Sequence, residues 1–421
     1  MKTRLDRQAW HCHLQRGLLS CWLIALVWCV ARGGSAQQDT PPVALTLAAA
    51  QTAAQSAAPD VLVSAARLQG SRADVGVAGM LPNPRLTTGS TTGSARLYGN
   101  LFMALPIFGQ RGKAMDAADA LARVAEAGVD VARIDARLAV SLAWTELWLL
   151  QQETQIAVDN AARRLRVFSA AEARFEEGAG PRLDVLRADA EAERTKAEIA
   201  ALEQQRRAAA ARLSAYLSQP EAPPSLHAEG EPPATERVPA LAELDMVLTE
   251  HPLVRRAHAA VENSDLSLAR DQRARWPLVG VQIGGNVRER HPEPTNDLQI
   301  ALSAEIPIYN GALIARSQTA RNITRAEMNA ITIQLRAGLA SALSEYAAAE
   351  GRFRAQMEHV LPATREAAEL AAEAYKSGGL DLTGVLAAEQ ALSDARFLAV
   401  RVQADRGRLL SNLEHAVGRP L

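Results

Sequence analysis

Two short stretches of the 421-residue chain decide its fold: RFEEGAGPRLDVLRADA (Arg174–Ala190) and AYKSGGLDLTGVLAAEQ (Ala374–Gln390). Each has an aromatic residue three positions before a glycine, and each resumes with Val-Leu seven and eight positions after that glycine. The sequence on both sides is rich in alanine, leucine and charged residues, which is typical of long helices. The stretches therefore predict two matched turns, each interrupting a long helical segment.

The matched turns belong to a longer internal repeat. Gly178 and Gly378 are 200 residues apart, whereas Asn83-Pro84 and Trp276-Pro277 are 193 residues apart. The offset changes only between residues 84 and 106, where the first copy has a shorter loop. Spacings that match on both sides of one insertion predict a chain built from two copies of one unit.

Each copy is expected to contain a helix, a pair of short strands, a very long helix, the glycine turn and a return helix. The expected bounds are about 44–79, 84–107, 111–177 and 182–217 in the first copy, and 240–275, 277–308, 312–375 and 382–417 in the second. The domains are then a first repeat (37–218), a stiff linker with six prolines (219–239) and a second repeat (240–421).

The two long helices are expected to differ at one place. Pro362 should kink or break the second of them, because proline removes a backbone donor and clashes with the preceding turn. Ala162 stands at the matching place in the first copy and should leave that helix straight.

The expected strands alternate between apolar and polar residues, as in a sheet with two different faces. Leu298, Ile300 and Leu302 fall on one face of the last strand and Gln299 on the other, whereas Phe102 interrupts the polar face in the first copy. A sheet on a soluble core and a membrane barrel both fit this pattern, and a secreted chain favours the barrel. Four strands cannot close a barrel, which needs at least ~8, so the wall would be shared between subunits.

The composition excludes several classes of function. A formal net charge of -1 without a basic run argues against nucleic acid as a partner. The sequence contains no phosphate-binding glycine loop, zinc-type spacing or nucleophile elbow, so no enzyme activity, cofactor or metal site is expected. His251 and His258 are expected to be solvated, and Trp144 and Trp148, one helical turn apart, are expected to pack in a core.

The N-terminus has the features of a secretory signal peptide (1–36). Basic residues precede an apolar run from Leu18 to Val30, and a small-residue segment then ends at Ala36, the expected cleavage site. All three cysteines lie within 1–36, so the mature chain would need no disulfide.

The sequence resembles the TolC family of outer-membrane efflux proteins over roughly residues 44–418. The similar segments are LPNPRL (81–86), LPIFGQRGKAMDAADA (105–120), VLPATREAAELAAEAYKSGGLDLTGVLAAEQALSDA (360–395) and LEHAVG (413–418). The resemblance implies a mainly α fold with a small β part, in which three subunits each give four strands to a twelve-stranded outer-membrane β-barrel. An α-helical coiled-coil tunnel would continue the barrel across the periplasm, with a mixed α/β belt that includes residues near 219–239.

The resemblance also implies a function, namely the exit duct of a tripartite efflux pump in the outer membrane of a Gram-negative cell. The implied partners are two further copies in a homotrimer, outer-membrane lipid, a periplasmic adaptor (membrane fusion) protein and an inner-membrane efflux transporter. A type I protein-secretion exit duct and a periplasmic coiled-coil scaffold without a pore are the alternatives. The scaffold would keep residues 84–106 and 277–308 in water.

The two turns would form the periplasmic tip, where the tunnel narrows and the adaptor binds. Gly178, Gly180, Gly378 and Gly379 are the expected turn residues, and Gly178 and Gly378 should permit the left-handed backbone that ends a helix. The candidate gate residues are Asp184, Tyr375, Arg182, Lys376 and Asp381.

The gate departs from the pattern of the resembled family. Asp184 and Tyr375 stand where a family member has its gating aspartate and tyrosine, but Leu380 replaces that member's arginine. Gly384 and Ala387 replace an acidic constriction, so a cation-binding ring is not expected. Arg182 or Lys376 would then assist Asp184 and Tyr375 in closure.

Overall fold

The computed structural model describes residues 43–90, 97–217, 226–235, 240–288 and 295–421. The expected signal peptide and parts of the proline-rich linker lie outside the described residues. In chain order the elements are β1 (Val43–Thr46), α2 (Leu47–Ala57), α3 (Pro59–Ala78), β2 (Arg85–Gly89), β3 (Leu97–Leu105), α4 (Gln110–Glu176), α5 (Arg182–Ala215), β4 (Leu226–Glu229), α6 (Leu241–Asp245), the 3₁₀ turn η1 (Leu248–Glu250), α7 (Pro252–Arg273), β5 (Leu278–Arg288), β6 (Thr295–Glu305), α8 (Gly311–Ala355), the π-helical turn η2 (Gln356–Val360), α9 (Leu361–Lys376) and α10 (Leu382–Val417).

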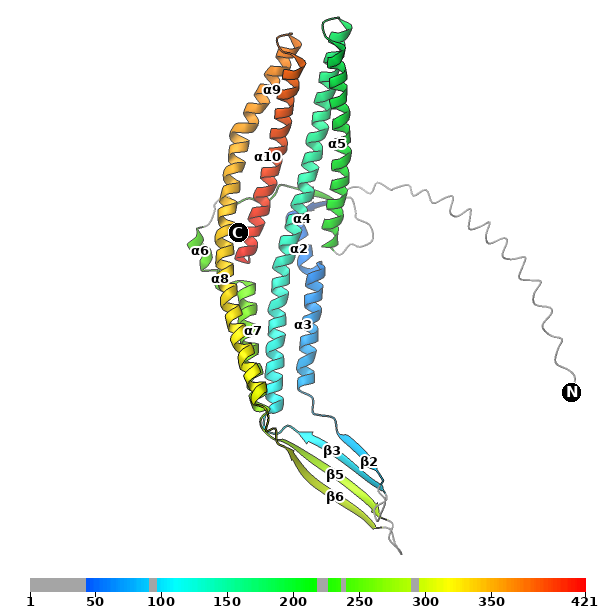
Figure 1. The fold of residues 1–421 in the computed structure, drawn as a ribbon, viewed down its shortest axis with the longest axis vertical. Coiled ribbons are helices and arrows are strands. Elements are labelled where there is room, and N and C mark those ends of the chain that lie inside the picture. The colour runs from blue at the N-terminus through cyan, green and yellow to red at the C-terminus, as the bar shows by residue number, and fades with distance from the viewer. Residues whose placement is uncertain (1–42, 91–96, 218–225, 236–239, 289–294) are drawn as a thin grey trace, which may run out of the picture. The chain divides into compact units, whose positions relative to one another are not determined.

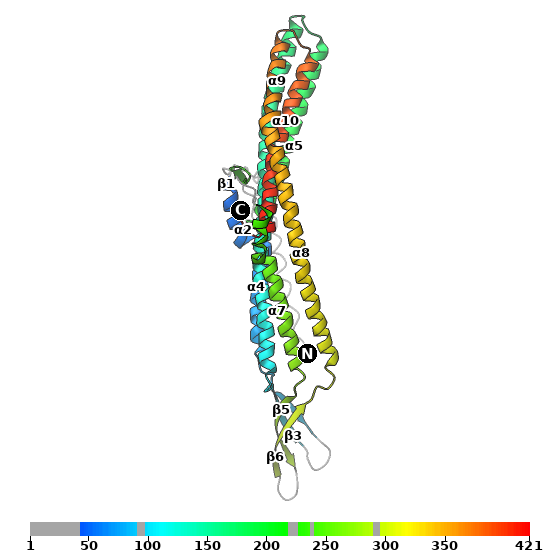
Figure 2. The ribbon, with the colours of Figure 1, turned by 90° about the vertical axis from the view of Figure 1, so that its left-hand side faces the viewer.

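The long helix α4 organises the unit Val43–Leu421. It has 67 residues, which corresponds to about 100 Å at ~1.5 Å per residue. It packs against α5, its partner in the first hairpin, and against α2, α3, α7 and α10. The glycine turns of both hairpins lie at one end of the helices, and the four-stranded sheet lies at the other (Figures 1 and 2). No helix among the described residues combines the length and apolar character needed to cross a membrane.

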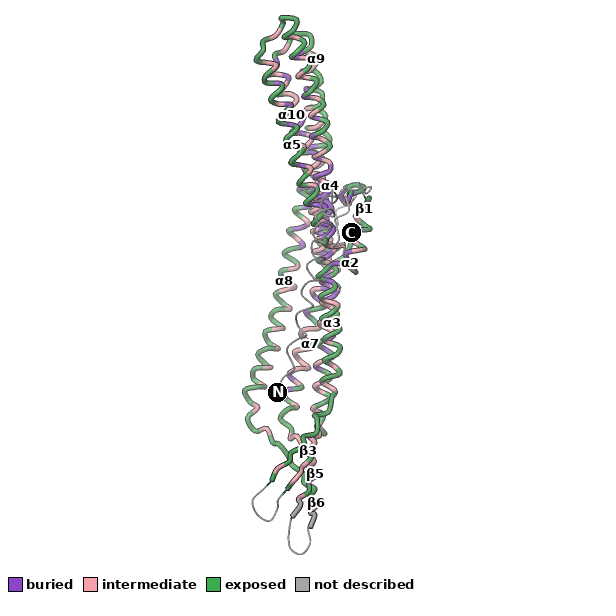
Figure 3. Tube along the Cα trace, turned by 90° about the vertical axis from the view of Figure 1, so that its right-hand side faces the viewer, coloured by how far each residue is buried: buried purple, intermediate pink, exposed green. Residues whose placement is uncertain are grey.

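The largest buried cluster lies where the middle of α4 meets α2, α5 and β4. Trp144 and Trp148 are buried there, which confirms their expected packing role. The indole Nε1 of Trp144 donates a hydrogen bond to the carbonyl oxygen of Leu45 in β1, at 2.8 Å. β1 pairs in parallel with β4, which lies within the proline-rich linker. Part of the linker therefore packs beside this cluster, in the part of the molecule where buried residues concentrate (Figure 3).

The first helix of each copy is broken at a proline, which corrects the expected continuous helices 44–79 and 240–275. Ala58 is extended, with ψ 138°, and separates α2 from α3, which begins at Pro59. In the second copy α6 and η1 precede α7, which begins at Pro252. The ring of a proline clashes with a preceding residue in the α conformation, so a helix starts anew at the proline.

The second long helix is interrupted next to Pro362, as predicted, whereas α4 continues through Ala162. The turn η2 replaces the α-helical hydrogen-bond pattern over Gln356–Val360, and α9 follows it. The buried Gln356 amide donates a hydrogen bond from Nε2 to the carbonyl oxygen of Ala395 in α10, at 2.9 Å. A π-helical turn adjacent to a proline is one of the recognised causes of a bend in a helix.

The four-stranded sheet joins the two expected hairpins in the antiparallel order β2-β3-β5-β6. Leu86, Leu101, Ile283 and Ile300 are register partners across all four strands, so they form one row on one face. All four side chains are exposed in the single chain. The sheet therefore presents one apolar face that the chain itself does not cover.

Glycines on the opposite face explain why Phe102 interrupts its polar pattern. A Cβ at Gly280 would lie 2.1 Å from Cε2 of Phe102, so the ring occupies the space above that glycine. A Cβ at Gly284 would lie 1.9 Å from Oδ1 of Asn100 in the same way. The bulky side chains of β3 thus lie over glycines of β5.

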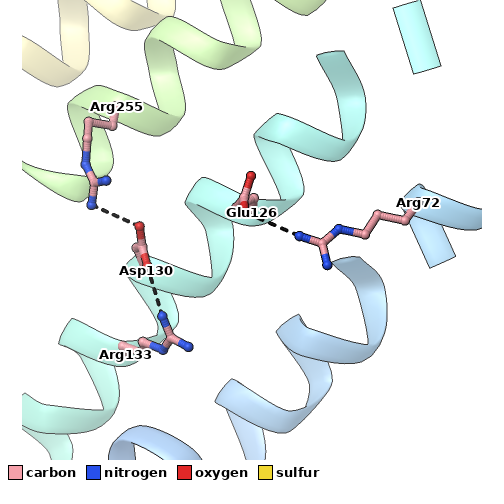
Figure 4. A network of polar contacts seen from close by, with 5 residues as sticks. All are labelled: Arg72, Glu126, Asp130, Arg133 and Arg255. Carbon is pink, nitrogen blue, oxygen red and sulfur yellow. Dashed lines mark hydrogen bonds and ion pairs between the residues drawn. The ribbon is translucent and has the colours of Figure 1, made fainter. Parts of the chain in front are cut away.

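Ion pairs join α4 to the helices on either side of it (Figure 4). Arg72 of α3 contacts Glu126 at 3.3 Å, and Arg255 of α7 contacts Asp130 at 2.9 Å. Asp130 also pairs with Arg133 on its own helix, at 3.2 Å. Pairs this exposed contribute ~0–1 kcal/mol each, so apolar packing holds the helices together.

His251 corrects the expectation that both nearby histidines are solvated, because it is buried while His258 is exposed. Its Nδ1 accepts a hydrogen bond from the backbone N–H of Leu253 at 3.1 Å and so caps α7. Its Nε2 lies 3.1 Å from the carbonyl oxygen of His415 in α10 and donates to it. Burial lowers the pKa of His251, so the neutral ring is favoured.

Candidate functional site at the two hairpin turns

The two glycine turns share one backbone geometry. Gly178 has φ 73° and Gly378 has φ 79°, which confirms the predicted left-handed conformation. In the first turn Gly178 N–H donates to the carbonyl of Phe175 and Ala179 N–H to that of Arg174, at 3.0 and 2.8 Å. The equivalent bonds in the second turn are 3.1 and 2.8 Å long. Both are Schellman motifs, which end a helix by satisfying its last carbonyl groups.

The other two predicted turn glycines, Gly180 and Gly379, have φ outside the left-handed region, so the question there is whether a side chain would have space. A Cβ at Gly180 would lie 3.3 Å from Cβ of Arg174, so the missing side chain permits close approach to the end of α4. A Cβ at Gly379 would come no closer than 3.6 Å to its nearest neighbour, the carbonyl oxygen of Ala374. Of this pair, only Gly180 is constrained by space.

Tyr375 lies at the centre of the site, in a small apolar cluster with Leu382, Val385 and the partly buried Val167 of α4. Its side chain is 4% exposed, whereas the matching Phe175 of the first turn is 44% exposed. Burial raises the pKa of the Tyr375 phenol, and the negative charge of Asp184 raises it further, against the opposing effect of Arg174. The structure thus brings Asp184 and Tyr375 into one electrostatic neighbourhood.

Arg174 is the residue of this site that the sequence reasoning missed. Its Nη1 donates to the carbonyl oxygen of Tyr375 at 3.3 Å, and its Nη2 donates to that of Ala179 at 3.5 Å. The guanidinium carbon also lies 4.8 Å from the centroid of the Tyr375 ring, within cation–π range. One side chain of the first hairpin therefore connects both turns.

The remaining gate candidates are placed differently. Arg182 and Lys376 are exposed and make no ion pair or side-chain hydrogen bond within the described residues. Asp381 is the N-cap of α10, where Oδ1 accepts a hydrogen bond from the Gly384 N–H at 2.9 Å. Leu380 stands where the resembled family member has an arginine, and its side chain packs over Gly384. A Cβ at Gly384 would lie 2.8 Å from Cδ1 of Leu380.

Known proteins share both sequence and fold with this chain. Residues 50–219 match the family model described as outer membrane efflux protein. The chain is 23% identical over 382 residues to the cobalt-zinc-cadmium resistance protein CzcC of Cupriavidus metallidurans, which covers 89% of this chain and 90% of that protein. 

Two solved structures show the fold. CusC, studied for its folding and transmembrane channel formation, superposes with a TM-score of 0.74 at 17% identity over 89% of this chain and 92% of its own. The open state of the MtrE outer membrane channel of Neisseria gonorrhoeae has a TM-score of 0.72 at 18% identity, over 89% of both chains. Over residues 50–219 the chain is similar in sequence to the outer membrane efflux protein family, and its hairpin pairs, matched turns and four-stranded sheet form the same fold as these solved channels.

Proposed function

We propose that this chain is the outer-membrane exit duct of a tripartite efflux system. The observation that carries the proposal is the uncovered apolar face of the four-stranded sheet. β5 and β6 have 11 residues each and β3 has nine, and a strand that crosses a bilayer needs ~9–11. An apolar face of this kind is unfavourable in water and favourable against lipid.

The four strands point to a homotrimer. A sheet with two open edges leaves backbone N–H and C=O groups unpaired, which lipid does not tolerate. Three copies would supply twelve strands and close the wall, with the long helices continuing it through the periplasm. The sequence shows no catalytic constellation, so the duct is proposed to conduct passively, with energy and substrate choice supplied by an inner-membrane transporter and its adaptor.

The hairpin turns are the proposed site of adaptor contact and closure. Gly178, Gly180, Gly378 and Gly379 would shape the surface that meets the adaptor. Tyr375 and Asp184 would hold the closed state, with Arg182, Lys376 and Asp381 as neighbouring charges. Arg174 supports this placement, because it bonds to the backbone of both turns at once.

Efflux is favoured over type I protein secretion by one observation. The relative CzcC, matched over most of both chains, is named for resistance to cobalt, zinc and cadmium. Genes for an adaptor and a proton-driven pump beside this gene would support efflux, whereas a neighbouring peptide-exporting ATPase would support secretion.

The duct is tested by conductance of the mature chain purified in detergent. We expect an oligomer that dissociates to the monomer on heating, and discrete conductance steps in planar lipid bilayers. The matched control is the same sample after heating, which should give no steps. A mature chain that is monomeric and soluble without detergent, and silent in bilayers, would overturn the proposal in favour of the scaffold.

A further inference from the structure

A cavity of about 260 Å³ lies at the middle of α4, far along the chain from either hairpin turn. It forms where α2 and the start of α7 meet α4 and the end of α10. The carboxylates and guanidinium groups that line it are those of Asp130, Arg133, Arg137, Arg255, Glu414 and Arg419. The proposed conduit function does not use this cavity.

Positive charge is in excess around the cavity. Four arginines line it, but only two carboxylates do, those of Asp130 and Glu414. Asp130 is shared by Arg133 and Arg255, at 3.2 and 2.9 Å, and Figure 4 shows it between the two guanidinium groups. The formal charge of these six side chains is therefore +2, and one carboxylate serves two cations.

The other two arginines have unused hydrogen-bonding capacity. Among the described residues, Arg137 pairs with Glu414 through Nη2 alone, at 3.2 Å, and its buried Nε has no hydrogen-bond partner. Arg419 is exposed and makes no ion pair within the described residues. A guanidinium group has five donors in a planar fork that matches the oxygens of phosphate and carboxylate groups.

The helix ends around the cavity favour an anion as well. The 22-residue helix α7 begins at Pro252 on the cavity wall, and a helix N-terminus carries partial positive charge. The opposing carbonyl groups at the end of α10 are already occupied: those of Glu414 and His415 accept hydrogen bonds from Gly418 N–H, and that of His415 also accepts one from His251.

We propose that this cavity binds a small dianionic oxyanion, such as phosphate or a dicarboxylate. Arg419 and Arg137 supply the free donors, and Arg133 with Arg255 complete the positive rim. The bound anion would neutralise the excess charge and connect the end of α10 to α4 and α7. It would thereby stabilise the region where the helices of the two copies meet.

The test is a titration of the purified full-length protein with inorganic phosphate, and in a second arm with succinate, at constant ionic strength against chloride. Phosphate raises the melting temperature of most proteins because it is excluded from their surfaces. The criterion is therefore a saturable shift, with a binding isotherm measured by calorimetry. Arg419→Gln removes one free cation without breaking any ion pair, and Arg352→Gln, an exposed arginine outside the cavity, is its matched control.

We expect saturable binding by the wild type and by Arg352→Gln, and about tenfold weaker binding by Arg419→Gln, as for loss of one charge-assisted hydrogen bond. Binding of succinate alone, with the same dependence on Arg419, would assign the site to dicarboxylates. No saturable binding of either anion, or equal binding by Arg419→Gln and the wild type, would overturn the proposal. These outcomes are independent of bilayer conductance.

Discussion

Arg174 shows how one side chain can hold two hairpin turns together. It combines a cation–π contact with hydrogen bonds to two backbone carbonyl groups. Because each bond to a charged group is worth ~1.5–3 kcal/mol, its loss should loosen the second turn against the first. We expect Arg174→Ala, and more weakly Asp184→Ala, to raise antibiotic leak and single-channel conductance.

We call the contact of Arg174 with the carbonyl groups of both turns the clamp. Two further variants distinguish the effect of losing this clamp from the effect of losing a positive charge at the tip. Arg187→Ala removes an exposed arginine of the same hairpin that is not a gate candidate and has no ion pair in the described structure, so it should leave leak and conductance unchanged. Arg174→Lys keeps the charge but loses the planar fork, so it should behave like Arg174→Ala. Wild-type leak in both Arg174 variants would refute the clamp.

His251, which lies between α7 and α10, should make the stability of the folded protein depend on pH. Its pKa is lowered by burial, so the unfolded chain takes up the proton first as the pH falls below about 6.5. The stability that it contributes is therefore complete above that pH and is lost on acidification. We expect the melting temperature to fall less between pH 7.5 and 5 in His251→Asn, which can still cap the helix, than in the wild type. The exposed His258→Asn should retain the wild-type dependence, and a steeper fall in His251→Asn would contradict the assignment.

At the scale of elements, substitutions on the two faces of the sheet test which face contacts lipid. Ile300 lies in the apolar row and is 71% exposed, whereas the adjacent Gln299 is exposed on the other face. An arginine on a lipid-facing strand costs ~2–4 kcal/mol near the bilayer midplane, so Ile300→Arg should reduce heat-sensitive oligomer in outer-membrane fractions. Gln299→Arg should assemble normally. Equal assembly of both variants would show that the row does not face lipid.

The helices show which local signals could be read from the sequence. Pro362 predicted an interruption correctly, because a proline acts on the hydrogen bonds of its own turn. The breaks before Pro59 and Pro252 follow from the same chemistry, because the residue before a proline is disfavoured in the α conformation, so α3 and α7 each begin at a proline.

At the scale of the whole molecule, the repeat gives matched backbones with unmatched side chains. Both turns are Schellman motifs, yet Tyr375 is buried and Phe175 is exposed. Arg174 has Ala374 as its counterpart, so only the first hairpin carries the clamp. The second hairpin alone has the π-helical turn beside Pro362. Duplication therefore provides a common backbone, and divergence of single residues gives the two hairpins different side-chain contacts.

The sequence by itself determined the repeat, the strand alternation, the left-handed glycines and the interruption at Pro362. These features depend on residues close together in the chain, where φ preferences, periodicity and proline chemistry act directly. Only the tertiary structure decided that Arg174 reaches Tyr375, that His251 is buried against His415, and that four arginines surround one cavity. Those contacts join residues more than 100 positions apart, and packing of whole helices, rather than any local preference, sets which side chains meet.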